Sequence, residues 1–312
     1  MTHLLLPLIT ANLLPMRTNI RRWIRRVLKG AQLPGIGSLT NESLIRTYLE
    51  SGRIPWSPGY IEHRTECLGR TFEDATLLRR FRQSDQLPAG YGYRMDERVV
   101  EYPWVLSRSL EWGSNVLDAG STLNNPLLLA HPAIKNKQLI IYSLAHDWME
   151  RRPNISYISG DLREMILRDQ IIDVAVCIST LEHIGLDNTI LYTQDKRYQE
   201  NRPLDYTAVL AEFRRILKPR GRLLITVPFG KPLQLQWLQQ FDQQGIEKII
   251  SEFGGKVLGL SYFKYDPSGW VRSTAAECGE CEYFDIHAKS ECDPDYAAAA
   301  RAVACLDLER TD

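Results

Sequence analysis

The sequence predicts an α/β protein built on a doubly wound, mostly parallel β-sheet with helices on both faces. From about residue 95 onward, apolar runs of strand length alternate with helical segments, which is the order that produces such a sheet. The runs are almost continuously apolar, as expected for strands buried on both faces. Two later apolar runs are expected to extend the sheet at its far edge, with an antiparallel edge strand.

The individual elements follow from length, periodicity and turn residues. The expected strands are residues 115–118, 138–143, 156–159, 172–178, 222–227, 257–264 and 302–308. The expected helices are residues 41–50, 95–110, 126–133, 146–151 and 205–217. The last helix is the clearest, because its apolar residues form one stripe and Asp205 stands where a cap is expected.

Composition limits the classes of function. The 312 residues are 44% hydrophobic and 24% charged, as in an ordinary globular protein. Lys+Arg and Asp+Glu are both 38, so no overall field favours nucleic acid. Six scattered cysteines do not form a secreted disulfide pattern. We therefore expect a cytoplasmic protein that does not act on nucleic acid.

The chain divides near residue 95. Residues 1–94 are expected to form an irregular helical N-terminal extension, and residues 95–312 the main domain. Within the extension, residues 17–29 combine Arg and Lys with apolar residues at helical spacing and contain no acid. This basic amphipathic helix predicts peripheral contact with a membrane surface, or alternatively a helix that caps its own domain.

Residues 115–126 predict a ligand-binding corner, in which a strand leads through a glycine turn into a helix. Asp118 ends the strand, Gly120 allows a tight turn, and Asn125 and Pro126 begin the helix. Such a turn lets backbone N–H groups and a helix N-terminus approach an anionic ligand. An isolated turn of this kind is more often structural, because Asp and Gly favour turns anyway.

Four segments in fixed order resemble the class I S-adenosylmethionine-dependent methyltransferases, of the small-molecule, Leu-Glu-His type. They are Val116–Asn124, which matches the acid and first glycine of the family's turn; Ile155–Leu162, ending in Gly-Asp; Ile172–Ile184, with Leu-Glu-His; and Leu210–Pro228, with Leu-Lys-Pro-Arg-Gly. The resemblance implies a Rossmann-like fold and S-adenosylmethionine as the cofactor.

The resemblance also implies roles for individual residues. Asp161 is expected to accept from the adenine amino group, with the Leu162 N–H meeting the ring. The other expected cofactor-binding residues are Asp118, Gly120, Ser121, Asn124, Ser143 and Ser179. The family usually ends its second strand in an acid that binds the ribose, whereas this chain has Ser143 there, with Asp147 in the next turn as the alternative.

Methyl transfer to a hydroxyl needs a base near the methyl group. His183 is the predicted catalytic base, with Glu182 as its orienting group or a cofactor contact. We expect O-methylation of a small-molecule, glycan or lipid-linked acceptor, recognised in part by residues 185–203. Nucleic acid is further disfavoured because Ser179–Glu182 replaces the Asn/Asp-Pro-Pro-aromatic turn of enzymes that methylate it.

Two other functions remain open from the sequence. One is a methyltransferase-like binding protein that has lost catalysis, since two glycines and the ribose acid are missing. The other is a nucleotide-dependent oxidoreductase, although residues 120–125 lack its Gly-x-Gly-x-x-Gly turn. Cys278, Cys281, His287 and Cys292 have zinc-ligand types and spacing, but without a second paired knuckle we expect no metal site.

Overall fold

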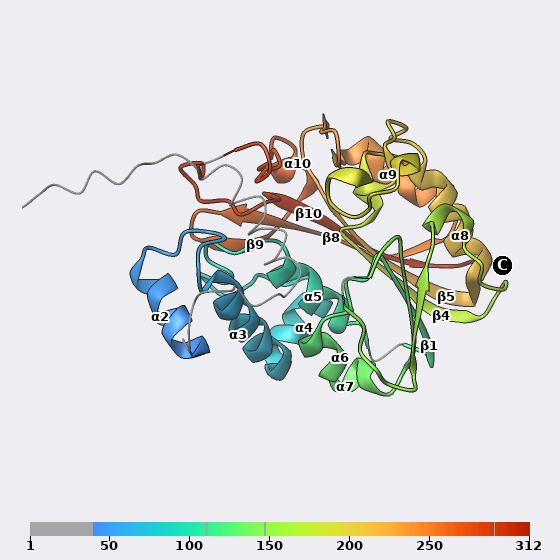
Figure 1. Ribbon diagram of the computed structural model, residues 1–312, viewed down its shortest axis with the longest axis horizontal. Helices are drawn as coiled ribbons and strands as arrows, with labels where there is room; N and C mark the ends of the chain where they lie inside the picture. The colour runs from blue at the N-terminus through green and yellow to red at the C-terminus, as the bar shows by residue number, and fades with distance from the viewer. Residues whose placement is uncertain (1–39, 110–111, 147, 290) are drawn as a thin grey trace, which may run out of the picture. The chain divides into compact units, whose positions relative to one another are not determined.

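An eight-stranded sheet forms the centre of the protein in the computed structural model, which describes residues 40–109, 112–146, 148–289 and 291–312 (Figure 1). Its strands lie in the order β3-β2-β1-β4-β5-β10-β8-β9. They are β1 (Asn115–Ala119), β2 (Gln138–Ser143), β3 (Ile155–Ser159), β4 (Ile172–Ile178), β5 (Leu217–Pro228), β8 (Lys256–Asp266), β9 (Gly269–Ser273) and β10 (Ala302–Glu309). A separate hairpin joins β6 (Leu233–Gln234) to β7 (Gln239–Gln240).

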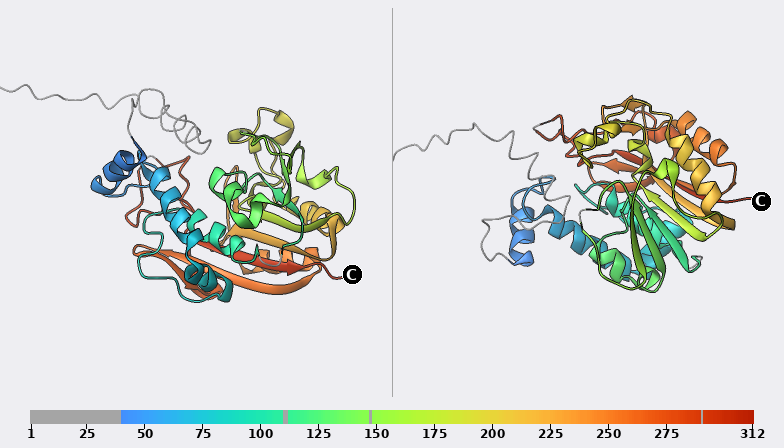
Figure 2. Two further views of the ribbon diagram at one scale, coloured as in Figure 1. Left: turned by 90° about the horizontal axis from the view of Figure 1, so that it is seen from below. Right: turned by 45° about the vertical axis from the view of Figure 1, so that its right-hand side comes forward.

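The mostly parallel, doubly wound sheet is confirmed. Strands β1 to β5 pair in parallel, and β9 is an antiparallel edge strand on β8. The predicted strand at residues 302–308 lies inside the sheet, because β10 pairs antiparallel with both β5 and β8. Figure 2 shows this last strand, drawn red, within the sheet.

Helices cover both faces of the sheet (Figure 1). One face packs against α3 (Tyr60–Glu73), α4 (Ala75–Gln83), α5 (Arg98–Leu106), α6 (Pro126–Ala130) and α7 (Pro132–Lys135). The other packs against α8 (Tyr206–Ile216), α9 (Gln243–Phe253) and α10 (Ala275–Cys278). Successive side chains of β4 point to opposite faces of the sheet. Val174 and Val176 therefore pack in the core on the first face, and Ala175 and Cys177 pack in the core on the second.

Two helical predictions differ from the structure. The helix expected at 126–133 is divided into α6 and α7, because Pro132 begins a new helix capped by His131. The helix expected at 146–151 does not form among its described residues. There the Glu150 N–H donates to the Tyr157 hydroxyl at 2.7 Å, and the Trp148 carbonyl accepts from Asn124 at 2.8 Å, so tertiary bonds replace helical ones.

The described part of the N-terminal extension is packed on the main core. The predicted helix at 41–50 is α2 (Asn41–Glu50), and Leu68, Phe72 and Phe81 share a core cluster with Val99. The basic segment 17–29 lies outside the described residues. No helix among residues 40–109, 112–146, 148–289 and 291–312 is long and apolar enough to cross a membrane.

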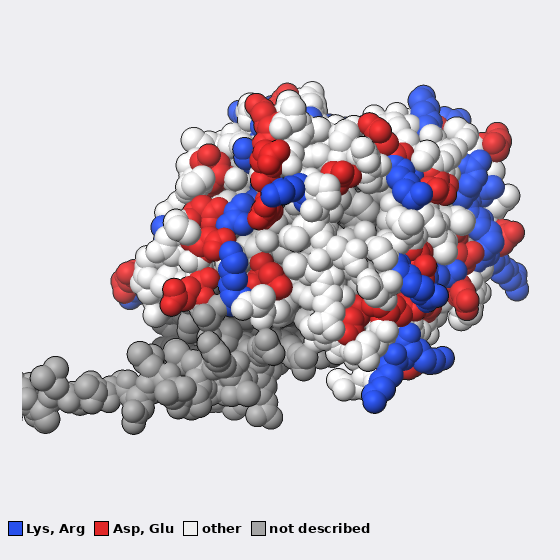
Figure 3. Space-filling view, turned by 90° about the horizontal axis from the view of Figure 1, so that it is seen from above, with Lys and Arg blue, Asp and Glu red and all other residues white. Residues whose placement is uncertain are grey.

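Charges of both signs are mixed on the described surface. Figure 3 shows Lys and Arg beside Asp and Glu on one face of the molecule, consistent with the equal totals in the sequence.

Candidate functional site

The acid of the glycine turn, Asp118, holds the turn together from inside. Its side chain is fully buried, and its two oxygens accept the backbone N–H groups of Thr122 at 3.0 Å and Leu123 at 2.9 Å. Burial raises the pKa of Asp118 to about 7, although these N–H groups favour the ionised form. Asp118 therefore shapes the corner through the backbone that it caps.

Gly120 brings the corner against the turn that follows β4. Its φ of +107° is a conformation that side chains rarely adopt, and an added Cβ would overlap Thr180 Oγ1. Ser121 follows with φ +65°, also in the left-handed region. Two segments 60 positions apart, Gly120 and Thr180, are thus in direct contact.

Asn124 and Ser143 lie where the corner meets the end of β2. Asn124 Nδ2 donates to the Trp148 carbonyl, and Asn124 Oδ1 accepts from the Tyr157 hydroxyl at 3.0 Å. Ser143, the last residue of β2, is half-buried. Asp147 lies outside the residues that the structure describes. The β2–β3 connection is therefore folded against the corner at the position where the family places its ribose acid.

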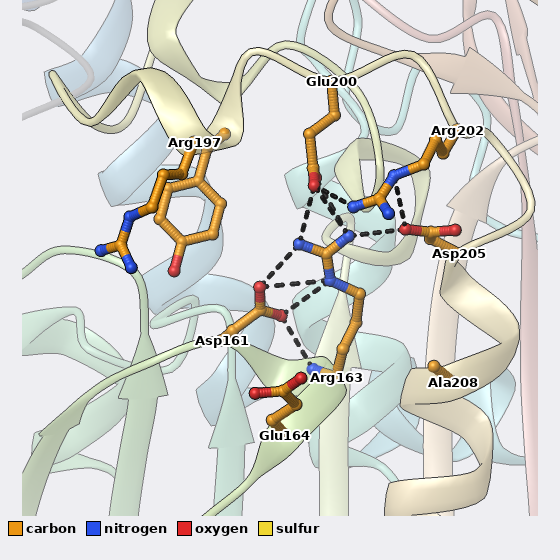
Figure 4. A pocket seen from close by; sticks show the side chains of 9 residues that line it. Asp161, Arg163, Glu164, Arg197, Glu200, Arg202, Asp205 and Ala208 are labelled. Atoms are coloured by element: carbon orange, nitrogen blue, oxygen red, sulfur yellow. Dashed lines mark hydrogen bonds and ion pairs between the residues drawn. The ribbon is translucent and has the colours of Figure 1, made fainter.

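Asp161 is engaged by an arginine (Figure 4). It stands two residues after the end of β3 and caps the short 3-10 helix η2 (Leu162–Glu164), accepting the Arg163 N–H at 2.9 Å. Arg163 Nη2 and Nε also donate to Asp161, at 2.7 and 3.0 Å. Burial alone would raise the pKa of Asp161, but the hydrogen bonds and charge of Arg163 bring it below its usual range. Leu162 beside it is buried.

A polar pocket of about 430 Å³ opens beside Asp161 (Figure 4). It lies between η2, the segment that contains the 3-10 helix η5 (Lys196–Tyr198), and the start of α8. Its lining residues are Asp161, Arg163, Glu164, Arg197, Tyr198, Glu200, Arg202, Asp205 and Ala208. Sequence reasoning missed Arg163, because nothing in the pattern pairs it with residues 37 and 42 positions away.

Ser179 ties the end of β4 to α5. Its hydroxyl donates to Glu101 Oε1 at 2.6 Å, and its N–H donates to the Thr226 carbonyl at 3.0 Å. Glu101 is fully buried, also accepts from the Thr226 hydroxyl at 2.6 Å, and pairs with Arg98. In the structure the Ser179 hydroxyl is thus held within the protein scaffold.

His183 has one defined tautomer. It ends the 3-10 helix η3 (Leu181–His183), and its Nδ1 lies 2.9 Å from the Trp237 carbonyl. A carbonyl only accepts, so Nδ1 carries the proton and Nε2 of the neutral ring keeps its lone pair. Nε2 lies 3.3 Å from the Tyr192 hydroxyl. Burial lowers the pKa of His183 to about 4, so the ring is neutral at pH 7.

Trp237 supplies the orientation that the sequence assigned to Glu182. Its ring stacks on His183, with centroids 5.5 Å apart and an interplanar angle of 15°. Glu182 Oε1 lies 3.9 Å from His183 Nε2, too far for a hydrogen bond. No sequence signal links Trp237 to His183, because they are 54 positions apart.

Glu182 is a buried carboxyl with spare bonding capacity. It is 2% exposed, and its Oε2 has no hydrogen-bond partner among the described residues. Burial raises its pKa well above the usual range. The carboxyl is therefore harder to ionise than an exposed glutamate, and in its protonated form it could donate one hydrogen bond.

The segment expected to recognise the acceptor returns to the Leu-Glu-His turn. The Arg202 N–H donates to the Gly185 carbonyl at 2.6 Å, and Gly185 has φ +76°. Nearby, the 3-10 helix η4 (Asn188–Ile190) leads into Tyr192, whose side chain is exposed. Residues 185–203 thus bring the Tyr192 hydroxyl to Nε2 of His183.

The cysteines considered as zinc ligands lie in different surroundings. Cys278 and Cys281 are buried in the apolar cluster of α8 and α9, whereas the His287 ring lies 4.9 Å from the Trp237 ring. Within the described ranges, no group of three or more His, Cys, Asp or Glu residues could hold a metal ion.

Comparison with known proteins identifies the domain. Residues 141–225 match a family model described as "Methyltransferase domain". No curated protein matches the chain. The match covers the Gly-Asp turn, the Leu-Glu-His turn and the long helix, whereas the glycine turn at 116–124 lies before it. It confirms the recognition of a class I S-adenosylmethionine-dependent methyltransferase and the cofactor that this class uses.

Solved structures resemble the chain only distantly. A Burkholderia thailandensis 1,6-didemethyltoxoflavin-N1-methyltransferase with bound S-adenosylhomocysteine is 14% identical, over 67% of this chain and 76% of that one, with TM-score 0.41. A Mesorhizobium loti S-adenosylmethionine-dependent methyltransferase is 12% identical, over 66% and 97%, with TM-score 0.41. The cyclase SpnF is 15% identical, over 78% and 94%, with TM-score 0.44. None of the three is similar enough to bear on the acceptor.

Proposed function

We propose that this class I S-adenosylmethionine-dependent methyltransferase transfers the methyl group to a hydroxyl of a small-molecule or glycan acceptor, with His183 as the base. One observation carries the proposal. The glycine turn and the Leu-Glu-His turn are in contact, since Gly120 has no room for a side chain beside Thr180. A cofactor seated at the corner would therefore lie next to the turn that bears His183.

The described residues fit the cofactor at two of its three parts. The bare backbone at Gly120 and the turn closed by Asp118 suit the amino-acid end. The carboxylate of Asp161 suits the adenine amino group, because Arg163 keeps it ionised. For the ribose, the residue at the end of β2 is Ser143, which has a hydroxyl in place of a carboxylate. The bound cofactor supplies the electrophilic methyl group, so the protein has to orient the acceptor and exclude water.

The geometry of His183 supports a hydroxyl acceptor. A neutral hydroxyl is a poor nucleophile unless a base takes its proton, and Nε2 of His183 has a lone pair turned toward a hydroxyl, that of Tyr192. The Trp237 carbonyl holds the ring in place and would stabilise the proton on Nδ1 once Nε2 is protonated. An acceptor hydroxyl bound near Tyr192 would pass its proton to Nε2.

The class of acceptor rests on residues of segment 185–203, whose Arg202 N–H bonds to the Gly185 carbonyl beside the Leu-Glu-His turn. Tyr192 is exposed, and Arg197 and Tyr198 line the polar pocket, a combination that suits a sugar or a carboxylated or phosphorylated small molecule. A lipid-linked acceptor remains a proposal based on residues 17–29, which lie outside the described part of the chain. The balanced surface charge does not favour nucleic acid.

The ribose position favours a second candidate, a methyltransferase-like binding protein without catalysis. Strand β2 ends without a carboxylate, and the side chain of Asn124 is bonded to its own neighbouring loop. Weak cofactor binding would follow if these residues do not rearrange. Calorimetry with S-adenosylhomocysteine separates the two candidates, because the enzyme is expected to bind it and the degenerate protein is not.

Replacing the base tests the catalytic proposal. His183→Ala is expected to lower methyl transfer by about a hundredfold or more, the usual contribution of a general base, while leaving S-adenosylhomocysteine affinity within about twofold. Transfer is measured with methyl-labelled S-adenosylmethionine and a panel of sugars, hydroxy acids and phenols, each paired with its amine counterpart.

The matched control is His131→Asn, which keeps a capping side chain on α7 and should leave transfer unchanged. An H183A variant that binds the cofactor and transfers methyl groups at the wild-type rate would remove His183 from the chemistry. Transfer to amines alone would contradict O-methylation.

A further inference from the structure

Arg163 is the hub of a half-buried ion-pair network (Figure 4). Besides Asp161, its guanidinium pairs with Glu200 at 3.0 Å and with Asp205 at 2.7 Å. The side chain is only 15% exposed. Three carboxylates from three separate segments thus share one cation: the turn after β3, the segment after η5, and the N-terminus of α8.

The network extends back to the Leu-Glu-His turn. Arg202 also pairs with Glu200 and with Asp205, the latter at 3.1 Å, and its N–H donates to the Gly185 carbonyl at 2.6 Å. Gly185 lies two residues after His183 in the sequence. A continuous chain of contacts therefore runs from the predicted adenine-binding carboxylate to the residues beside the predicted base.

Asp205 reflects this role in its own geometry. It stands at the N-cap of α8, yet its side chain makes no capping hydrogen bond. Its carboxylate instead turns toward Arg163 and Arg202. The Asp205 carboxylate therefore forms ion pairs with two arginines in place of the capping hydrogen bond that stabilises many helix N-termini.

We propose that Arg163 is a positioning residue that couples cofactor binding at Asp161 to the placement of residues 196–205 beside the acceptor site. The inference rests on the proposed function. Arg163 holds Asp161 ionised and in one orientation for the adenine. A cofactor that fixes Asp161 also fixes Arg163, and with it Glu200 and Asp205, so the acceptor segment becomes more ordered when the cofactor is bound.

Exchange and calorimetry together test the coupling. In the wild-type protein, S-adenosylhomocysteine is expected to slow amide hydrogen exchange in residues 196–205. In Arg163→Gln, Asp161 loses its arginine partner, whereas Glu200 and Asp205 keep Arg202, so affinity for S-adenosylhomocysteine should fall on the order of tenfold. The slowing of exchange in 196–205 should disappear even at saturating ligand, which a general loss of affinity would not cause.

Two further variants keep the test specific. Arg70→Gln also removes one arginine, but Arg70 is 63% exposed, pairs with Glu66 and lies outside the pocket, so affinity and exchange should match the wild type. Arg163→Lys keeps the charge without the planar fork and should restore affinity in part. Thermal unfolding in the absence of ligand establishes that each variant is folded.

The inference is overturned if R163Q binds S-adenosylhomocysteine like the wild type, or if saturating ligand still slows exchange in 196–205 of that variant. It is equally overturned if R70Q behaves like R163Q, since a nonspecific charge effect would then suffice. Wild-type protein that does not bind S-adenosylhomocysteine would count against the proposed function itself.

Discussion

Single residues in the corner have distinct tasks that their types make possible. Asp118 closes the turn through two backbone N–H groups, and Gly120 gives space to Thr180. Thr122 and Asn124 stand where the family's next two glycines are expected. Ser121 has the left-handed backbone that a glycine would adopt easily. At Gly120, unlike at Ser121, a neighbouring side chain leaves no room for a Cβ. We therefore expect the corner to tolerate no other residue type at position 120.

Gly120→Ala therefore should disrupt the corner more than a positive φ alone would. Left-handed backbone costs a non-glycine residue roughly 1–2 kcal/mol, and the overlap with Thr180 forces a further shift of the β4 turn. We expect a larger loss in the free energy of unfolding than that, measured in urea, and a loss of S-adenosylhomocysteine binding measured by calorimetry.

Gly90 offers the matched control. It has φ +77° and open space around an added Cβ, so Gly90→Ala should show the backbone cost without loss of binding. If G120A were no more destabilised than G90A and bound the cofactor product normally, the contact between the two turns would not matter for the site.

Residues that act through the backbone or within one motif could be predicted from the sequence, and those that act across the fold could not. Asp118, Gly120, Asp161 and His183 stand in local patterns with a chemical meaning. Trp237 and Arg163 acquire their roles only through contacts made by folding. Their partners are distant in sequence, and a single chain gives no sign of such pairing.

At the scale of elements, α5 is joined to the sheet by one buried acid. Glu101 accepts the hydroxyls of Ser179 on the β4 turn and Thr226 on β5, and pairs with Arg98. Sequence analysis predicted the helix but not this function, because a glutamate in an amphipathic helix is ordinarily exposed. The bond explains how the turn after β4 is held in place.

Glu101→Gln is expected to lower the free energy of unfolding by about 3 kcal/mol, because it leaves Arg98 without its charge partner inside the protein. The loss is measured as a lower urea midpoint with an unchanged slope. Glu66→Gln removes an exposed helical pair with Arg70, and this control should change stability by less than about 0.5 kcal/mol. Equal effects of the two variants would show that Glu101 is not the anchor of α5.

Strands were more predictable than helices for a physical reason. A buried parallel strand must be apolar along its length, so β2 and β4 have the predicted limits. The predicted helix at 146–151 had only a weak pattern, and hydrogen bonds to Asn124 and Tyr157 decided its structure. Arg220, which replaces a family glycine, still adopts φ +64° in the turn within β5, so the local shape survives the substitution.

At the scale of the whole molecule, β10 joins the two parts of the open sheet. Strand β10 pairs with β5 on one side and β8 on the other, and its residues 302–308 are buried. The two parts of the sheet are therefore joined through a strand that follows both β5 and β8 in the sequence. The sequence pattern identified the strand, but apolar runs carry no information about which neighbours a strand will choose.

Ending the chain after Arg301 should consequently prevent the fold from forming. Strands β5 and β8 would each be left with an unpaired edge inside the protein, and the core residues of β10, including Leu306 and Leu308, would be missing. We expect aggregated protein, or soluble protein without a cooperative unfolding transition by circular dichroism. Ending the chain after Thr311 removes only the exposed Asp312 and should preserve both solubility and cooperativity. A cooperative transition in the chain that ends at Arg301 would show that the parallel strands β1 to β5 fold without β10, and that the last strand serves only to extend the sheet.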